Sequence, residues 1–230
     1  MKKPIILSLL ISLLLPGTAI ADSYTSLWKK YDAAVQKDHP QTALKVLYNI
    51  ADKAERERAY GHLLKAQMAT ADQMLALSPD SLQPTVERMQ QCEKAAEGSG
   101  DKVLAAVYES VLGAVYTNNS SLLEGGEELG KDYYRKSMRY PDALAAAFSS
   151  NYEPFVVDGV DSKYYYDDML HIIGMRAGDY RTMHDYYASH GKREGACLTA
   201  LQLARDERRA NDVGYVRKSK YIMSLDSLAR

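Results

Sequence analysis

The chain has 230 residues with 29 basic and 30 acidic side chains, so its formal net charge is −1 at neutral pH. This balance gives no electrostatic reason to expect nucleic acid or an anionic membrane surface as a partner. Tyrosine is frequent, with 18 residues against two phenylalanines and one tryptophan, and this usage suits stacked helices with half-buried faces, because tyrosine buries its ring while its hydroxyl reaches water.

The first 21 residues have the three parts of a secretory signal peptide. Lys2 and Lys3 form the basic start, residues 5–15 an apolar run, and Ala19-Ile20-Ala21 a cleavage site with small residues at its ends. The apolar run is too short to span a membrane, and no later segment reaches that length. We therefore predict a signal peptide at 1–21 and an exported protein, periplasmic or secreted.

The apolar residues that follow repeat with the period of an α-helix. The first stripe comprises Ala43, Leu47, Ile50 and Ala54. A second stripe covers 60–75, and a third, over 104–115, is broad enough to predict a centrally packed helix in which Gly113 lets a neighbour approach closely. The sequence predicts an all-α fold of stacked antiparallel helical hairpins, a degenerate tetratricopeptide-like superhelix.

Helix ends are predicted by proline, serine and glycine. Pro40 and Pro141 suit the first position of a helix. Ser81 follows the end of one helix and is placed to cap the next. Gly191 is placed to end a helix in the left-handed conformation, at the corner of a hairpin.

One segment interrupts the helical pattern. Residues 149–163 lack the helical period and contain Pro154 and Gly159. We predict an irregular loop there, between an N-terminal helical-repeat unit at 22–148 and a C-terminal helical unit at 164–230. Because the apolar stripe continues to the last residues, we expect the second unit to be truncated.

The spacing of potential ligands predicts no metal and no cofactor. Acidic residues of the loop region lack the alternation of a calcium loop; they are Asp158, Asp161, Asp167 and Asp168. His184 and His190 are six residues apart, so they point to different sides of a helix and do not form a zinc pair.

The two cysteines leave alternatives open. Cys92 and Cys197 each lie on an apolar helical stripe, where a packed thiol is common, but an exported protein can also join two cysteines in a disulfide. Burial on such a stripe would make Cys197 unreactive. The chain also lacks a nucleophile elbow, a phosphate loop and a dinucleotide fingerprint, so we predict that it is not an enzyme.

Four stretches carry a family resemblance: "SYTSLWKKYDAAVQKDHPQTALKVLYNIADKA" (23–54), "SPDSLQPTVERM" (78–89), "VYESVLGAVYTNN" (107–119) and "YYYDDMLHIIGMRAGDYRTMHDYYASHGKREGACLTALQLAR" (164–205). They resemble the N-terminal helical region of large bacterial alpha-2-macroglobulin-like proteins, a family of protease inhibitors. The macroglobulin β-sandwiches, the bait segment and the Cys-x-Glu-Gln thioester motif have no counterpart here. The resemblance therefore implies a helical domain that precedes macroglobulin domains, and it transfers no functional residue.

We expect a non-enzymatic interaction or positioning module whose partner is another protein or the downstream macroglobulin domains. Neighbouring tyrosines cannot all face the core, so some are expected to form a contact surface. The candidates are Tyr164, Tyr165, Tyr166, Tyr186 and Tyr187. Packing within a hairpin is the other role open to them. The alternative function is a stand-alone periplasmic peptide- or glycan-binding protein, which would need a deep tyrosine-lined pocket.

Overall fold

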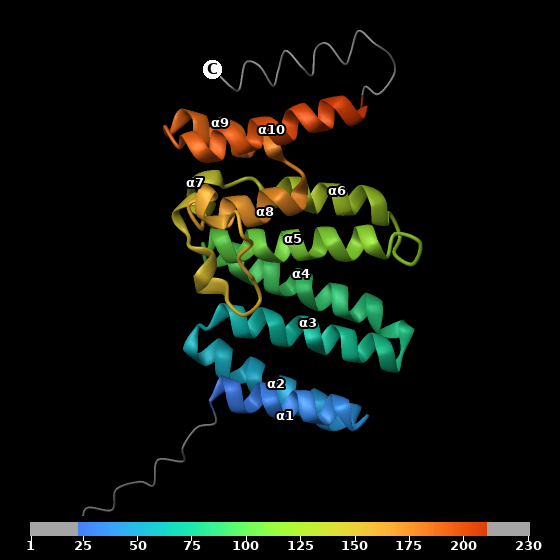
Figure 1. Cartoon of the computed structure of the whole chain (residues 1–230). Helices are drawn as coiled ribbons and strands as arrows, with labels where there is room; N and C mark the ends of the chain where they lie inside the picture. The colour runs from blue at the N-terminus through green and yellow to red at the C-terminus, as the bar shows by residue number, and fades with distance from the viewer. Residues whose placement is uncertain (1–22, 211–230) are drawn as a thin grey trace, which may run out of the picture.

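The computed structural model describes residues 23–210. The predicted signal peptide at 1–21 and the part of the C-terminal unit at 211–230 lie outside these residues. Within them the fold is all-helical, without a strand, and consecutive helices stack from α1 and α2 at one end to α9 and α10 at the other (Figure 1). The predicted all-α fold is confirmed.

The helices have the following bounds: α1 Tyr24–Gln36, α2 Pro40–Glu57, α3 Tyr60–Leu77, α4 Leu82–Gly98, α5 Lys102–Asn118, α6 Gly126–Ser137, α7 Pro141–Ala146, α8 Met169–Ala177, α9 Tyr180–Ser189 and α10 Arg193–Ala210. Three short 3₁₀ turns lie between them, η1 at Pro79–Ser81, η2 at Ser149–Tyr152 and η3 at Ser162–Tyr165. None of these helices is long and apolar enough to cross a membrane.

The helix ends follow the sequence signals with one difference. Pro40 and Pro141 are the first residues of α2 and α7, and Gly191 adopts φ +68° after α9. Ser81 precedes α4 as predicted, but its side chain does not cap that helix. Its hydroxyl instead donates to the carbonyl oxygen of Ser78 at 2.7 Å, which closes the turn η1.

Helix α5 is the centre of the molecule, as its broad apolar stripe predicts. It is buried on almost all sides, including Tyr108 and Leu112, and it contacts α4, α6, α7 and α8. A Cβ atom on Gly113 would lie 2.8 Å from Cδ1 of Tyr134, so the missing side chain makes room for a ring of α6. The backbones approach closely at Gly130 of α6, where a Cβ would lie 3.1 Å from the carbonyl oxygen of Gly113.

The hydrophobic core of the described residues has a main part, a second cluster between α3, α4 and α5, and a separate N-terminal part. The main cluster includes Leu64 of α3, Leu170 of α8 and Tyr187 of α9, so the two predicted helical units share it. The predicted stripe of α2 is fully buried. Two of its residues, Leu47 and Ile50, pack with Leu27 of α1 in a small cluster of their own.

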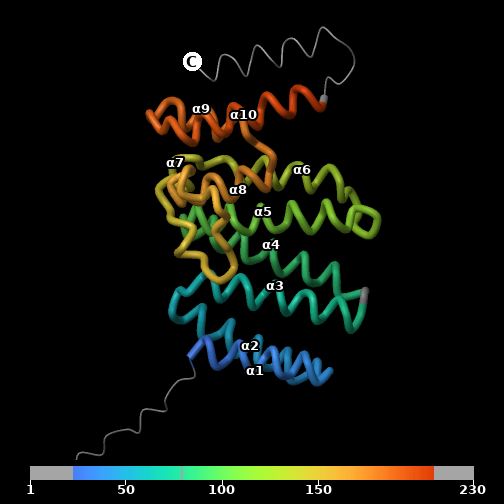
Figure 2. The backbone as a smooth tube through the Cα atoms, viewed as in Figure 1, coloured from blue at the N-terminus to red at the C-terminus, as the bar shows by residue number. Residues whose placement is uncertain are grey.

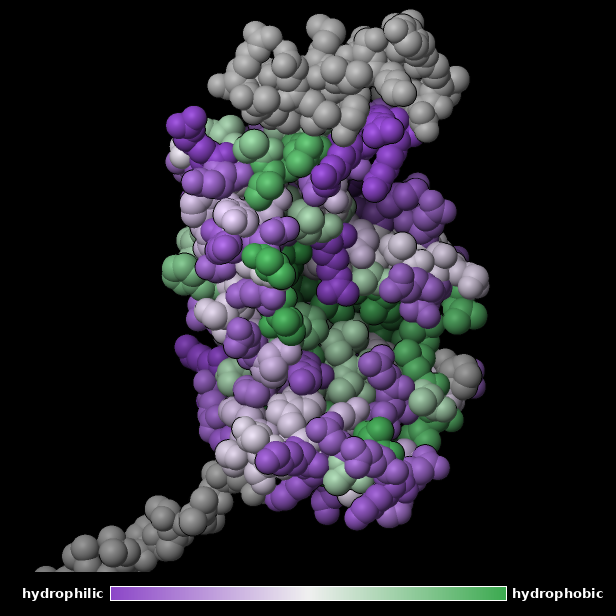
Figure 3. Space-filling view, viewed as in Figure 1, coloured by the Kyte–Doolittle hydropathy of each residue, from purple (hydrophilic) through white to green (hydrophobic). Residues whose placement is uncertain are grey.

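The 149–163 segment crosses the side of the stack and connects the level of α7 and α8 with that of α3. The tube in Figure 2 shows it running from α7 down to the level of α3 and back to α8. At its far point η2 contacts α3, where a Cβ on Gly61 would overlap the backbone of Glu153. Apolar side chains gather where this segment crosses the visible face (Figure 3), and Val157 and Val160 within it are 81% and 92% exposed.

Candidate functional site

The five predicted tyrosines do not form one exposed surface. Tyr164 is 43% exposed, and Tyr166 and Tyr186 are half-buried. Tyr165 and Tyr187 are buried, at 4% and 0% exposure, and both belong to the main core. These two are therefore packing residues, which corrects their assignment as contact candidates.

Tyr187 is buried because its hydroxyl has a partner inside the molecule. The hydroxyl donates to Oδ1 of Asp168 at 2.9 Å, and the backbone N–H of His171 donates to the same oxygen at 3.0 Å, capping α8. Burial raises the pKa of Asp168 above its usual range and also raises the pKa of Tyr187. A neutral donor beside a buried carboxylate is the arrangement that such burial requires.

The half-buried Tyr166 and Tyr186, together with the buried Tyr187, surround the ammonium group of Lys192. Nζ of Lys192 lies 3.6 Å from Oδ2 of Asp168. The same nitrogen lies 4.6, 5.6 and 5.7 Å from the ring centroids of Tyr166, Tyr186 and Tyr187. These distances are typical of cation–π contacts. The tyrosines at the hairpin corner thus stabilise the packing of α9 and α10.

The two cysteines are both free thiols. Cys197 is exposed, so its predicted place on the buried stripe of α10 is wrong. The buried face of α10 instead contains Gly195 and, one turn later, Thr199. A Cβ atom on Gly195 would lie 2.9 Å from the ring of Tyr187. Cys197 lies between these two positions along the helix and points away from α9.

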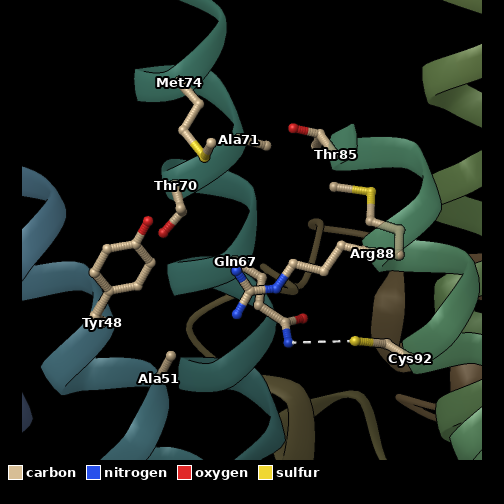
Figure 4. A pocket seen from close by; sticks show the side chains of 10 residues that line it. Tyr48, Ala51, Gln67, Thr70, Ala71, Met74, Thr85, Arg88 and Cys92 are labelled. Atoms are coloured by element: carbon tan, nitrogen blue, oxygen red, sulfur yellow. Dashed lines mark hydrogen bonds between the residues drawn. The ribbon is translucent and has the colours of Figure 1, made fainter. Parts of the chain in front are cut away.

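A groove lined mainly by apolar side chains lies between α3 and α4, with α2 on its far side. Helices α3 and α4 are joined through η1, yet they contact one another far less than α2 contacts α3 or α4 contacts α5. The cavity left between them is small, about 50 Å³, and is partly open to solvent. Figure 4 shows it from close by, with α3 between the side chains of α2 and those of α4.

The side-chain amide of Gln67 lies at the floor of the groove. Oε1 of Gln67 accepts a hydrogen bond from the hydroxyl of Tyr108 at 2.8 Å. Burial raises the pKa of Tyr108, so this hydroxyl keeps its proton and fixes which end of the amide faces α5. The amide nitrogen of Gln67 lies 3.8 Å from Sγ of Cys92, across the groove. Since an NH₂ group has two hydrogens, one remains for a ligand.

The walls are apolar and the rim carries a positive charge. Met74, Ala71 and Met89 provide apolar surface, and Tyr48 of α2 is 40% exposed. Arg88 is exposed on α4, and its side chain extends across the opening toward Gln67 (Figure 4). An apolar groove with one amide at the floor and one cation at the rim suits an apolar side chain that has an acidic neighbour.

No family model, curated protein or solved structure matches the chain. The function is therefore inferred from the groove and its chemistry.

Proposed function

We propose that the chain is a non-enzymatic helical-repeat interaction module whose α3–α4 groove binds a segment of a protein partner. The observation that carries this proposal is the preorganised groove itself, because Gln67 is oriented by Tyr108 before any ligand arrives. A cavity of about 50 Å³ has room for the end of a single apolar side chain of a peptide. Preorganised polar groups lower the cost of binding.

The lining favours peptide over glycan. Met74, Met89 and Cys92 place three sulfur atoms around the groove, and flexible sulfur-containing side chains adapt to apolar groups of different shape. Tyr48 is the single aromatic side chain among the lining residues, whereas a sugar ring is best bound against a broad aromatic face. The guanidinium of Arg88 favours a carboxylate on the partner.

The sequence supports a more specific role. The signal-peptide pattern at 1–21 and the family resemblance favour an exported module that positions macroglobulin domains or recruits a protein to them. The alternative, a stand-alone periplasmic peptide-binding protein, would use the same groove. The two differ in whether the bound segment belongs to a neighbouring domain or to a free peptide.

A peptide array probed with the full chain tests the proposal. We expect bound peptides to share an apolar residue next to an acidic one. Arg88→Glu should weaken their binding at least about tenfold, because like charges facing each other across an interface cost several kcal/mol. Met74→Trp should also weaken it, because the larger side chain fills the groove.

Lys94→Glu is the matched control, since Lys94 is another exposed cation of α4 that does not line the groove. Its peptide binding should stay within about twofold of the unchanged chain. Peptides that bind Arg88→Glu and Met74→Trp as well as they bind the unchanged chain would refute the groove as the binding site.

A further inference from the structure

Three glutamates converge on the side of α4 that faces α5. Glu93 and Glu97 lie one turn apart on α4, and Glu109 lies on α5. An oxygen atom of each lies within 4.8 Å of an oxygen of each of the other two. Glu109 is 0% exposed and Glu93 9%, so two of these carboxyl groups are fixed in the interior while Glu97 is at the surface.

One carboxylate oxygen of Glu109 lacks a hydrogen-bond partner among the described residues. Its Oε1 accepts from Arg139 at 2.5 Å, but its Oε2 is buried and has no hydrogen-bond partner among the described residues. A buried carboxylate oxygen without a donor is unfavourable, so it requires a proton or a cation. This atom is a second observation, besides the grouping of the acids, that indicates a missing partner.

The basic groups around the cluster do not balance it. Arg139 is the main one, and its Nη2 also lies 3.1 and 3.2 Å from the two oxygens of Glu97. The positive charge of Lys136 opposes the rise that burial causes in the pKa of Glu93, but no ion pair joins the two among the described residues. The hydroxyl of Tyr140 donates to Glu97 at 3.2 Å. When all three acids are ionised, the one guanidinium in contact leaves an excess of negative charge. Burial opposes this ionisation, because it raises the pKa of Glu93 and raises that of Glu109 to about 7.

We propose that Glu93, Glu97 and Glu109 bind a divalent cation that prefers oxygen ligands, such as Ca²⁺ or Mn²⁺. Two ligands of one ion at about 2.0–2.6 Å cannot lie much more than about 5 Å apart, and the spacing of these oxygens meets that limit. A set of carboxylates without nitrogen or sulfur selects hard cations over zinc or copper. Water completes the coordination from the open side at Glu97.

In this arrangement Arg139 and the ion compete for the same carboxylates. The side chain of Arg139 is 38% exposed, so it can turn to solvent when an ion enters between Glu97 and Glu109. Removing the guanidinium should therefore strengthen ion binding. If Arg139 only forms a structural ion pair, the opposite outcome is expected: added ions would not restore the stability lost with Arg139.

The test is calorimetric titration of the chelator-treated full chain with CaCl₂ and, separately, MnCl₂, together with thermal unfolding. We expect saturable binding of one ion per chain and a rise in Tm. Glu109→Gln and the surface variant Glu97→Gln should each weaken binding at least about tenfold, which a change of about 1.4 kcal/mol produces. Arg139→Gln should bind at least as tightly as the unchanged chain, and the ion should restore its lowered Tm.

Glu128→Gln is the matched control, since Glu128 is an exposed acid of α6 outside the cluster, and it should bind like the unchanged chain. The proposal is overturned if neither ion binds the unchanged chain or Arg139→Gln at millimolar concentration. It is also overturned if Glu97→Gln and Glu109→Gln, folded by circular dichroism, bind as the unchanged chain does. Arg88→Glu leaves this site intact, so failure here is distinguishable from failure of the groove.

Discussion

Replacing Tyr187 by phenylalanine tests whether the buried Asp168 organises the α8–α10 end of the molecule. Phenylalanine keeps the buried ring and removes the hydroxyl that donates to Oδ1 at 2.9 Å. Oδ2 of Asp168 accepts no hydrogen bond among the described residues, although Lys192 lies 3.6 Å away. The variant would therefore leave the backbone N–H of His171 as the one hydrogen-bond donor to this carboxylate.

A hydrogen bond to a charged group contributes about 1.5–3 kcal/mol. We expect Tyr187→Phe to lower the free energy of unfolding by about 2 kcal/mol, and Tm by about 4–8 °C for a domain of this size. Urea unfolding followed by circular dichroism measures the change, which should appear as a shift in midpoint with an unchanged m-value. Tyr164→Phe is the matched control, because Tyr164 is 43% exposed and its loss should cost less than about 0.5 kcal/mol.

A double-mutant cycle with Asp168→Asn identifies the cause of the loss. If the unpaired carboxylate is responsible, the two changes should couple by about 1 kcal/mol or more. A loss below about 0.5 kcal/mol for Tyr187→Phe, or independent effects in the cycle, would refute the role assigned to Asp168.

Two further predictions concern α3 and use the same unfolding assay or fluorescence. Nδ1 of His62 accepts from Nε1 of Trp28 at 3.0 Å, and burial, assisted by a nearby lysine, lowers the pKa of His62. The neutral imidazole is thus favoured in the folded state, so stability is complete above the unfolded-state pKa of about 6.5 and declines as the pH falls below it. The fluorescence of Trp28, the only tryptophan, should change with pH with a midpoint below pH 6.5. If His62→Gln showed the same pH-dependent change, His62 would not be its cause. Gly61→Ala should lower the free energy of unfolding by about 3 kcal/mol, because the added Cβ would overlap the backbone of Glu153. Gly98→Ala is the control and should not destabilise, because a Cβ there meets nothing within 4 Å. Equal effects of the two changes would show that the 149–163 segment does not pack tightly on α3.

The sequence predicts the helices well where only one face of a helix is apolar. The stripe from Ala43 to Ala54 is buried because polar residues on the other sides of α2 leave one way to pack it. Helix α10 carries alanine and leucine around most of its circumference, so the period alone does not show which face meets α9. Contact between Gly195 and Tyr187 decides that, and it moves Cys197 to the surface.

The tyrosines show a similar limit. In the pairs at 164–165 and 186–187, adjacent residues must point in different directions, and one member of each pair is indeed buried. In the 186–187 pair the buried member is Tyr187, whose hydroxyl donates to the carboxylate of Asp168. That partner is 19 residues away in sequence, and no local pattern connects them.

The two candidate sites depend even more on long-range packing. Thr85, Arg88 and Cys92 share one face of α4, which the sequence displays through their spacing of three and four residues. That this face looks across a gap toward α3 follows from the turn η1 and from α5 behind it. Likewise, Glu109 meets Arg139 across 30 residues, so neither the groove nor the carboxylate cluster was predicted.

The separate cluster around Leu47 determines where this architecture can change in length. Helices α1 and α2 pack on one another and on Ala66 of α3 in this small cluster, so loss of that hairpin would expose one face of α3 and leave the main cluster closed. At the opposite end Met183 and Tyr187 of α9 belong to the main core, and deletion of that hairpin would open it. Insertions or fusions are therefore expected to be better tolerated beside α1 than beside α9.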